Sequence, residues 1–173
     1  MNIALGGATR FSMIPTSTLV GIISDTHGLL RSEALAALRG CHMIIHAGDI
    51  GTPGVLTGLC KVAPVVAIRG NNDKGAWAGK LPETAVVEAD GTSLYVLHNV
   101  NDLELDPAVA GFRAVISGHS HRPSIRDWEG VLFVNPGSAG PRRFKLPVAV
   151  ARLRVVRAKV EAEVVELKGP GAS

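Results

Sequence analysis

The sequence predicts a two-sheet α/β sandwich, and three observations support this prediction. In the first half of the chain, short apolar runs alternate with helical segments, a pattern typical of a parallel sheet with crossover helices. From residue 84 onward, one strand signal follows another with few helical segments between them. The chain has 173 residues, of which 46% are hydrophobic, and neither a repeat nor a long linker divides it. A single domain over residues 19–173 is therefore expected, with a second sheet packed on the first.

The first half contains three expected strands and two expected helices. The strands are the apolar, β-branched runs at residues 19–24 (LVGIIS), 43–46 (MIIH) and 64–70 (PVVAIRG). Residues 32–39 are expected to form a helix with Ser32 as its N-cap and Gly40 just beyond its end. Residues 53–60 are expected to form a second, shorter helix.

The second half consists mainly of expected strands. Residues 84–98 are expected to form two strands of a β-hairpin around Asp90-Gly91, a dipeptide that favours a tight turn. Further strands are expected at residues 114–118, around Ser124-Ile125 and at residues 131–134. Residues 148–167 are expected to form two more strands around Arg157-Ala158.

Composition limits the class of protein. The net charge of +3 is modest, so nucleic-acid binding is not expected from charge alone, although it stays open. No apolar run approaches the roughly 20 residues that span a bilayer, so no membrane association is expected. Residues 1–18 make a poor signal peptide and are treated as an N-terminal extension of undetermined role. Cys41 and Cys60 lie in no metal or redox spacing and are expected to be buried thiols in a reducing cytoplasm.

Short polar motifs follow the expected strands at the points where the strands end. They are Asp25-Thr26-His27-Gly28, His46-Ala47-Gly48-Asp49, Gly70-Asn71-Asn72-Asp73, His98 and Gly118-His119-Ser120-His121. Each motif alone is a weak signal. Because the carboxyl ends of strands in an open α/β sheet converge on one edge, the five motifs are expected to face one another. The sequence therefore predicts a single site at this edge.

The residue types in these motifs are those of metal ligands. Asp25 and His27 are two residues apart, as are His119 and His121, and in an extended chain such pairs point to the same side. Carboxylate, imidazole and amide oxygen together favour Mn, Fe, Zn, Co or Ni over a thiolate-bound structural zinc. Adjacent glycines leave room for tight turns and for close approach of the backbone.

Two further polar residues are expected to support the ligands without binding metal. His46 lies within its strand, three residues before Asp49, and is expected to form hydrogen bonds behind the ligands. Asp73 is expected to orient Asn71 or Asn72 in the same way, as carboxylates behind metal ligands do.

With these motifs in view, the chain resembles the calcineurin-like metallophosphoesterases, in particular the small bacterial and archaeal YfcE type. The resemblance extends from about residue 19 to about residue 167. It rests on the ordered set DTHG, HAGD, GNND, His98, GHSH and the NPGS stretch at residues 135–138, a turn expected to support the last strands. It implies a four-layer αββα sandwich of two mixed sheets flanked by helices.

The resemblance also implies a ligand set for two divalent transition-metal ions, with Mn expected first and Fe, Zn, Ni or Co as alternatives. Asp25, His27 and His121 would hold one ion. Asn71, His98 and His119 would hold the other, and Asp49 would bridge the two. A hydroxide shared by the two ions would attack phosphorus, so no side-chain nucleophile is required.

Two departures from the related pattern bear on substrate. Asn72 stands where relatives have His or Cys; it is expected to bind the substrate phosphate, but an amide cannot protonate a leaving group. Phosphodiesters and activated monoesters are therefore the expected substrates. After His98, Asn99-Val100 replaces the related Gly-His, which changes the neighbouring pocket.

Other functions remain open at this stage. One alternative is a non-catalytic protein-interaction scaffold of the same fold, as in a retromer subunit, and the complete ligand set argues against it. A nuclease or cyclic-nucleotide diesterase stays within the expected hydrolase class. The expected partner is a small phosphoester substrate, and homo-oligomer formation is left open.

Overall fold

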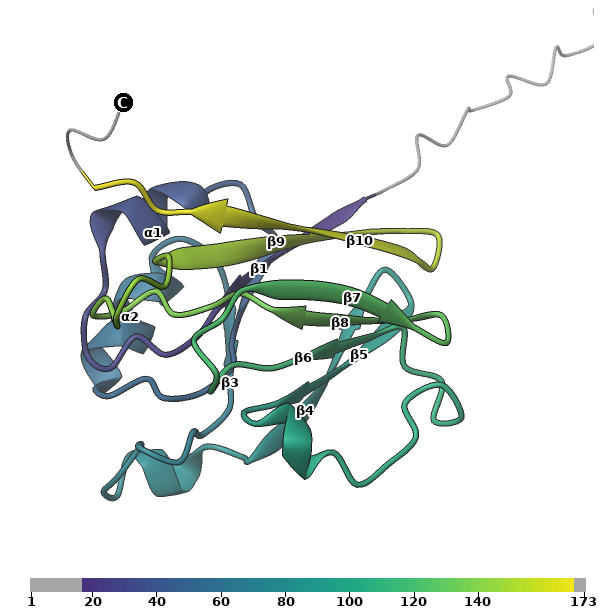
Figure 1. Cartoon of the computed structure of the whole chain (residues 1–173), viewed down its shortest axis with the longest axis horizontal. Coiled ribbons are helices and arrows are strands. Elements are labelled where there is room, and N and C mark those ends of the chain that lie inside the picture. Colours follow the sequence, from purple (N-terminus) through teal and green to yellow (C-terminus); the bar gives the residue numbers. More distant parts are fainter. Residues whose placement is uncertain (1–16, 170–173) are drawn as a thin grey trace, which may run out of the picture.

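The computed structural model describes residues 17–169, and its first sheet joins the beginning of this segment to its end (Figure 1). The strands are β1 (Thr18–Ile23), β2 (Met43–His46), β3 (Val65–Ala67), β9 (Ala149–Val156) and β10 (Lys159–Glu166), in the order β10-β9-β1-β2-β3. β1, β2 and β3 run parallel to one another. β9 pairs antiparallel with β1 on one side and with β10 on the other. Of the expected N-terminal extension, residues 1–16 lie outside the described residues.

The second sheet is also mixed. Its strands are β4 (Thr84–Ala89), β5 (Thr92–Leu97), β6 (Ala114–Ile116), β7 (Ser124–Trp128) and β8 (Val131–Asn135), in the order β4-β5-β6-β8-β7. β5, β6 and β8 are parallel, and the outer pairs β4-β5 and β7-β8 are antiparallel. The expected α/β sandwich of two mixed sheets is thus confirmed.

The two expected hairpin turns have the backbone that two-residue turns require. Asp90 and Gly91 have φ of 49° and 68°, and Arg157 and Ala158 have φ of 48° and 66°. Positive φ at both central residues matches the twist of antiparallel strands. The backbone N–H of Arg157 donates to the Asp90 carboxylate (3.2 Å), so the two turns, from different sheets, contact each other.

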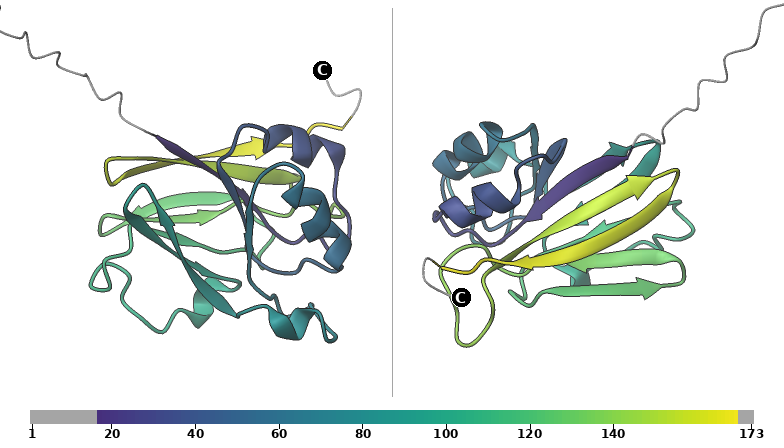
Figure 2. Two further views of the ribbon diagram at one scale, coloured as in Figure 1. Left: turned by 180° about the vertical axis from the view of Figure 1, so that it is seen from behind. Right: turned by 90° about the horizontal axis from the view of Figure 1, so that it is seen from above.

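Both α-helices lie on the same side of the first sheet (Figure 2). They are α1 (Ser32–Ala37) and α2 (Pro53–Cys60), with Pro53 at the start of α2, where its missing N–H leaves no donor unpaired. The expected N-cap was wrong by one residue, because Arg31 occupies that position and Ser32 is already helical. Residues 17–169 also form two 3₁₀ turns, η1 (Ala78–Lys80) and η2 (Val100–Asp102).

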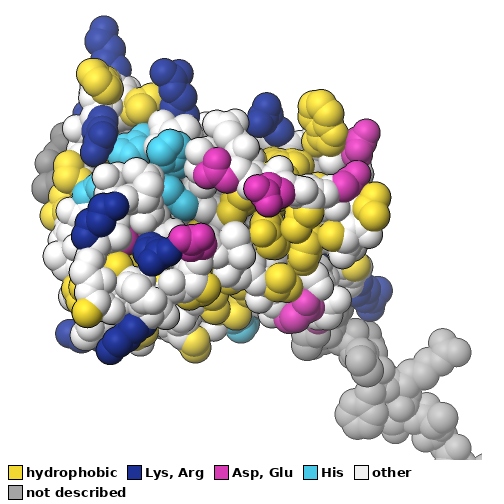
Figure 3. Space-filling view, turned by 90° about the horizontal axis from the view of Figure 1, so that it is seen from below, with side chains coloured by type: hydrophobic (Ala, Val, Ile, Leu, Met, Phe, Trp, Pro, Cys, Tyr) yellow, Lys and Arg dark blue, Asp and Glu magenta, His cyan; other side chains and the backbone are white. Residues whose placement is uncertain are grey.

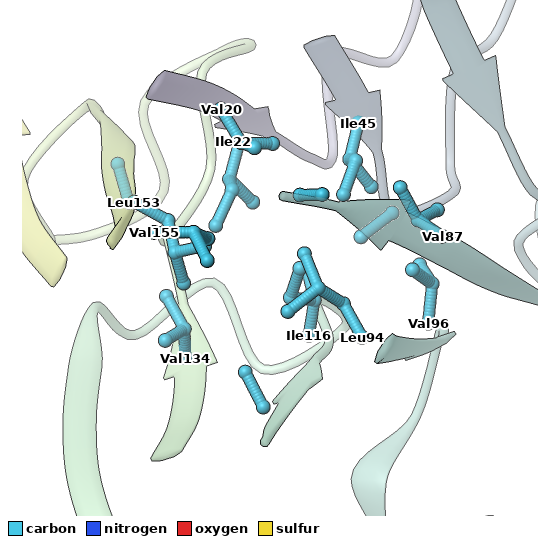
Figure 4. Packing of buried hydrophobic residues seen from close by; sticks show 14 of the residues in the cluster. Val20, Ile22, Ile45, Val87, Leu94, Val96, Ile116, Val134, Leu153 and Val155 are labelled. Carbon is cyan, nitrogen blue, oxygen red and sulfur yellow. The ribbon is translucent and has the colours of Figure 1, made fainter. Parts of the chain in front are cut away.

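The main core lies between the two sheets (Figure 4). Val20 and Ile22 of β1 point into it, whereas Ile23 packs with the helices. The rest of this core is apolar and β-branched in large part, with Ile45, Val87, Leu94, Val96, Ile116, Val134, Leu153 and Val155 among its members. Each such side chain contributes about 1.5–3 kcal/mol by leaving water. Burial on both faces explains why residues 19–23 of β1 and 43–45 of β2 are continuously apolar.

The outer face of the second sheet is covered differently from that of the first. In the described part of the chain, the segment after β5 with η2 packs Leu103 against Leu97, Val115 and Phe133, so a 3₁₀ turn takes the place of an α-helix. Both cysteines are free, but Cys60 is exposed and only Cys41 is buried as expected, because Cys60 lies on the outer side of α2. Among residues 17–169, no helix is long and apolar enough to cross a membrane.

Candidate metal centre

The five polar motifs converge at one end of the sandwich. Two clusters of potential ligands form there, one of Asp25, His27 and His121 and one of Asp25, Asp49 and His98, with all donor atoms of a cluster within 4.8 Å of one another. The residues come from the ends of β1, β2, β5 and β6, so both sheets contribute. Histidine side chains gather accordingly on one face (Figure 3). The motifs that were expected to face one another therefore lie together.

The first cluster consists of one carboxylate and two imidazoles. Asp25 Oδ1 lies 3.2 Å from His121 Nε2 and 4.0 Å from His27 Nε2. The two imidazole Nε2 atoms are 3.4 Å apart. Three donor atoms that face one common point match the first half of the expected ligand set.

The second cluster adjoins the first through Asp49. Asp49 Oδ2 lies 3.9 Å from His27 Nε2 and 3.5 Å from His98 Nε2, so one carboxylate oxygen contacts residues of both clusters. Asn71 Oδ1 and His119 Nδ1 are 3.1 Å apart, and the His98 and His119 rings are 5.2 Å apart between centroids. The structure therefore brings all seven expected ligand residues together.

Five of the seven residues have a left-handed backbone, with φ of 54° at Asp25, 47° at His27, 56° at Asp49, 66° at His119 and 58° at His121. This conformation is uncommon for residues other than glycine, and it concentrates at functional sites. The expectation that each Asp-x-His or His-x-His pair is extended was wrong. Because both residues of each pair have a left-handed backbone, each pair lies in a tight loop that directs both side chains into the site.

Burial controls the charge of the first cluster. It raises the pKa of Asp25, which is completely buried, against the lowering effect of a hydrogen bond from Ser24. Burial also lowers the pKa of His27 and of His121, so both imidazoles favour the neutral form that binds metal. A metal cation would offset the cost of keeping Asp25 ionised here.

Asp49 and His98 form a coupled pair. Burial raises the pKa of Asp49, but the nearby His98 and the amide and backbone N–H of Asn72 outweigh it and keep this pKa well below its usual range. Burial by itself lowers the pKa of His98. The Asp49 carboxylate and the hydrogen bond to the Ala47 carbonyl outweigh burial, so the pKa of His98 is raised overall. Asp49 is therefore ionised at neutral pH.

The unpaired atoms of the site fit a metal. Asp25 Oδ1, His98 Nε2 and His121 Nδ1 are buried and form no hydrogen bond. A buried polar atom without a partner costs roughly 1–3 kcal/mol, and two of these three are atoms that face the cluster centre. The carboxylate, imidazole and amide donors suit a borderline divalent transition metal.

Asn72 and Asp73 do not lie as the sequence predicted. The Asn72 side-chain amide donates to Asp49 Oδ2 (2.6 Å) and its backbone N–H donates to Asp49 Oδ1 (2.8 Å), so a substrate contact requires the amide to leave Asp49. Asp73 was expected to orient Asn71 or Asn72. Its carboxylate instead accepts from the backbone N–H groups of Gly51 (2.8 Å) and Gly70 (2.9 Å), because the loop folds back against the β2 loop.

His46 is buried behind the ligands, where it was expected. Its Nδ1 accepts from the Gly48 N–H (3.2 Å), so the proton is on Nε2, which donates to Thr26 Oγ1 (2.9 Å). Thr26 in turn donates to the Ile50 carbonyl (2.9 Å). Burial lowers the His46 pKa to about 3, so the ring is neutral. This chain of bonds ties the loop of Asp25 to the loop of Asp49.

The NPGS stretch supports the site more directly than expected. The Asn135 amide donates to the Gly118 carbonyl (2.7 Å) and to Ser120 Oγ (3.1 Å), which holds the loop of His119. Ser138 Oγ donates to the Asp25 carbonyl (2.9 Å). The only sequence signal for these roles was the presence of Asn and Ser in a turn motif, which does not indicate the partner.

Two glycines allow the loops to approach each other. A Cβ on Gly70 would lie 2.2 Å from both the backbone nitrogen and Oδ1 of Asp49. A Cβ on Gly118 would lie 1.9 Å from Ser24 Oγ and 2.7 Å from Asp25 Oδ2. Any side chain at either position would therefore displace a ligand.

An open cleft of about 1090 Å³ borders the second cluster. Asn71, His98 and His119 line this cleft. Its wall carries charges of both signs, from Arg69 and Lys74 and from Asp73, Glu83, Asp102 and Glu104, and Arg69 pairs with Glu83. A cleft of this size accepts a small organic phosphate.

The fold and these donors define a metal-binding α/β sandwich, and comparison with known proteins places it in a family. Residues 19–158 match the calcineurin-like phosphoesterase superfamily domain. A probable metallophosphoesterase of Methanothermobacter thermautotrophicus is 32% identical over 164 residues, which cover 88% of this chain and 94% of that protein. The chain therefore belongs to the calcineurin-like phosphoesterase superfamily, as its motifs indicated.

Solved structures agree with the fold. A structure described as a novel archaeal phosphodiesterase has a TM-score of 0.72 at 23% identity, covering 86% of this chain and 100% of its own. The YfcE phosphoesterase from E. coli has a TM-score of 0.63 at 20% identity, covering 87% and 100%. Vacuolar Protein Sorting 29 from Cryptosporidium parvum has a TM-score of 0.71 at 17% identity, covering 88% and 99%.

Proposed function

We propose that this chain hydrolyses phosphodiesters and activated phosphomonoesters with two divalent metal ions, Mn first among them. The observation that carries the proposal is the position of Asp49. One oxygen of its carboxylate lies within 4 Å of an imidazole from each cluster, His27 at 3.9 Å and His98 at 3.5 Å. A carboxylate shared in this way is suited to hold two adjacent cations.

The residues divide into two ligand groups around Asp49. Asp25, His27 and His121 would hold one ion, and Asn71, His98 and His119 the other. Bound ions supply Lewis-acid charge for the phosphoryl oxygens and activate water at neutral pH, so the proposal assigns no side-chain nucleophile. His46 and Thr26 keep the two ligand loops in register, and Asp73 anchors the loop of Asn71 through Gly70.

Asn72 would complete the substrate site. In the structure its amide donates to Asp49 Oδ2, the oxygen that faces both clusters. With Asp49 bound to a metal ion, the Asn72 amide would be free to donate to a phosphate oxygen instead. It has no proton to give a leaving group at neutral pH, which favours substrates whose leaving group departs unaided.

Relatives and composition support the proposal. The 32% identical relative is named a probable metallophosphoesterase, and a 27% identical protein of Methanocaldococcus jannaschii is named a phosphodiesterase. The two free thiols fit the expectation of a reducing cytoplasm. A small phosphoester remains the proposed partner.

The test is hydrolysis by metal-stripped protein with and without added Mn²⁺. Bis(p-nitrophenyl) phosphate and p-nitrophenyl phosphate serve as diester and activated monoester, and phenyl phosphate as a poor-leaving-group control. Mn²⁺-dependent release of p-nitrophenol from the first two supports the proposal. Equal rates with Mn²⁺ and with chelator would refute it.

A second candidate is a protein-interaction scaffold, and the likeness to Vacuolar Protein Sorting 29 favours it. The convergence of all seven ligand residues argues for catalysis instead. Metal binding without hydrolysis of any ester in the test above would favour the scaffold.

A further inference from the structure

The loop between β8 and β9 is anchored to the first cluster. Arg31 donates from Nε (3.3 Å) and Nη2 (3.2 Å) to the Gly140 carbonyl, and the Gly140 N–H donates to Ser138 Oγ (3.3 Å). A Cβ on Gly140 would lie 2.4 Å from the Thr26 carbonyl oxygen and 2.5 Å from that of Asp25. The loop therefore begins in contact with the backbone of a ligand residue.

Beyond this anchor the loop closes on itself and presents an aromatic side chain. The Leu146 N–H donates to the Arg143 carbonyl (3.1 Å), and Arg142 Nε donates to the Leu146 carbonyl (3.3 Å). Phe144, between these bonds, has φ of 53° and is 94% exposed. A bulky residue in the left-handed region is strained, and no packing repays the strain here.

The loop also brings positive charge to the first cluster. Arg143 follows the Gly140 anchor by three residues, and its side chain is exposed. Arg142 and Lys145 on the same loop are exposed. In Figure 3, Lys and Arg side chains stand around the histidine patch, together with Asp and Glu side chains.

We propose that loop 140–147 is a substrate-binding loop that selects phosphodiesters whose second ester group, the one that is not the leaving group, carries a nucleoside or aryl ring. Arg143 binds the phosphate, since a guanidinium matches phosphate oxygens with two parallel donors. Phe144 stacks on the base or aryl ring, an interaction that tolerates any flat ring. The inference rests on the proposed function and specifies its substrate class.

The position of the loop suits a phosphodiester whose two ester groups, here called its arms, differ from each other. The loop borders the first cluster, whereas the cleft that contains Arg69 and Lys74 borders the second. A phosphate held between the clusters can therefore direct one ester arm towards Phe144 and the other into the cleft. A rigid, exposed aromatic side chain loses little entropy on contact with a ring.

The experiment compares Phe144→Ala and Arg143→Gln with wild type on two esters of the same leaving group. Methyl p-nitrophenyl phosphate has no second ring, and thymidine 5′-(p-nitrophenyl phosphate) has a nucleoside. Phe144→Ala is expected to lower kcat/KM for the thymidine ester by about 5- to 100-fold and to leave the methyl ester within about twofold. Arg143→Gln is expected to lower both by about 10-fold or more.

Arg126→Gln on β7, an arginine of the outer face, is the matched control and is expected to leave both rates unchanged. Calorimetric titration with thymidine 5′-monophosphate gives a readout independent of turnover. Both loop variants are expected to weaken its binding, with bound metal equal to wild type.

An equal loss on both esters for Phe144→Ala, or no loss for Arg143→Gln, would overturn the assignment. So would a loss of bound metal in either variant. If wild type hydrolyses neither ester, the proposed function fails, and the nucleotide titration still decides whether the loop binds nucleotides.

Discussion

His98 directs its Nε2 at Asp49, 3.5 Å from Oδ2, because its Nδ1 donates to the Ala47 carbonyl at 2.7 Å. A carbonyl oxygen only accepts, so the proton of the neutral ring lies on Nδ1 and the lone pair on Nε2 faces the site. His98 follows β5 in the second sheet, whereas Ala47 and Asp49 follow β2 in the first. One hydrogen bond thus aims a proposed metal ligand across the junction of the two sheets.

The first prediction concerns this ligand. His98→Gln removes the Nε2 lone pair from the second cluster and is expected to lower metal-dependent hydrolysis by at least about 100-fold. His42→Gln is the matched control, since the His42 ring accepts from the Leu19 N–H (3.0 Å) away from the site. Its rate should stay within about twofold of wild type. Comparable losses in the two variants would show that His98 acts through general stability.

The second prediction concerns acid stability. The His46 pKa is about 3 in the folded protein and 6.5 as its ordinary value, so between these pH values the unfolded chain binds the extra proton. Stability due to this group is therefore present above pH 6.5 and is lost as pH falls, by about 1.4 kcal/mol per pH unit.

His46→Gln removes this titration, and urea unfolding of the metal-free proteins from pH 5 to pH 7.5 checks it. Burial also lowers the pKa of His27 and His121, which adds slope of the same sign to both proteins. The difference between the two slopes isolates His46 and should approach the full value below pH 6.5. Parallel slopes would mean that His46 is protonated in the folded state.

The third prediction concerns loop packing. Gly70→Ala places a Cβ 2.2 Å from Asp49, so Asp49 or the loop must move. We expect a loss of about 1–3 kcal/mol in unfolding free energy together with weaker metal binding. Gly79→Ala is the control, because a Cβ there meets nothing within 4 Å. Unchanged metal affinity in Gly70→Ala would show that the contact tolerates the methyl group.

The fourth prediction concerns Asn72. Asn72→His introduces a group that can protonate a leaving group, a contribution of about 10²–10⁴-fold in general acid catalysis. The gain should be largest for alkyl monoesters and smallest for p-nitrophenyl esters. Rates across a series of leaving groups, with their pH dependence, measure it. A lack of gain on poor leaving groups would remove Asn72 from the substrate site.

Much of the fold was predictable because its signals are local. β2 and α2 have the bounds expected for them. The signal for β2 is a continuous apolar run, and the signal for the start of α2 is a proline, and both can be read from neighbouring residues. The hairpin at Asp90-Gly91 was equally clear. The helix start at Ser32 was misplaced by one residue, because Arg31 takes the cap position without a side-chain bond.

The site was predictable as a set of residues but less so in its geometry. Strand-end order was enough to bring Asp25, Asp49 and His98 together. The bonds of Asp73 to Gly51 and of Asn135 to Gly118 join segments 22 and 17 residues apart. Such contacts depend on how the loops of the two sheets fold against each other. Local sequence patterns do not predict this arrangement. The left-handed backbone of His27 is likewise imposed by its surroundings.

The most direct test of the account is the metal content of wild type and Asp49→Asn after loading with Mn²⁺ and removal of free metal. Asp49 is the one residue assigned to both ions, and the substitution keeps its shape while removing its charge. Elemental analysis should find about two ions per chain in wild type and fewer than one in the variant, with circular dichroism unchanged. One ion or none in wild type, or equal content in the two proteins, would contradict a pair of metals bridged by Asp49.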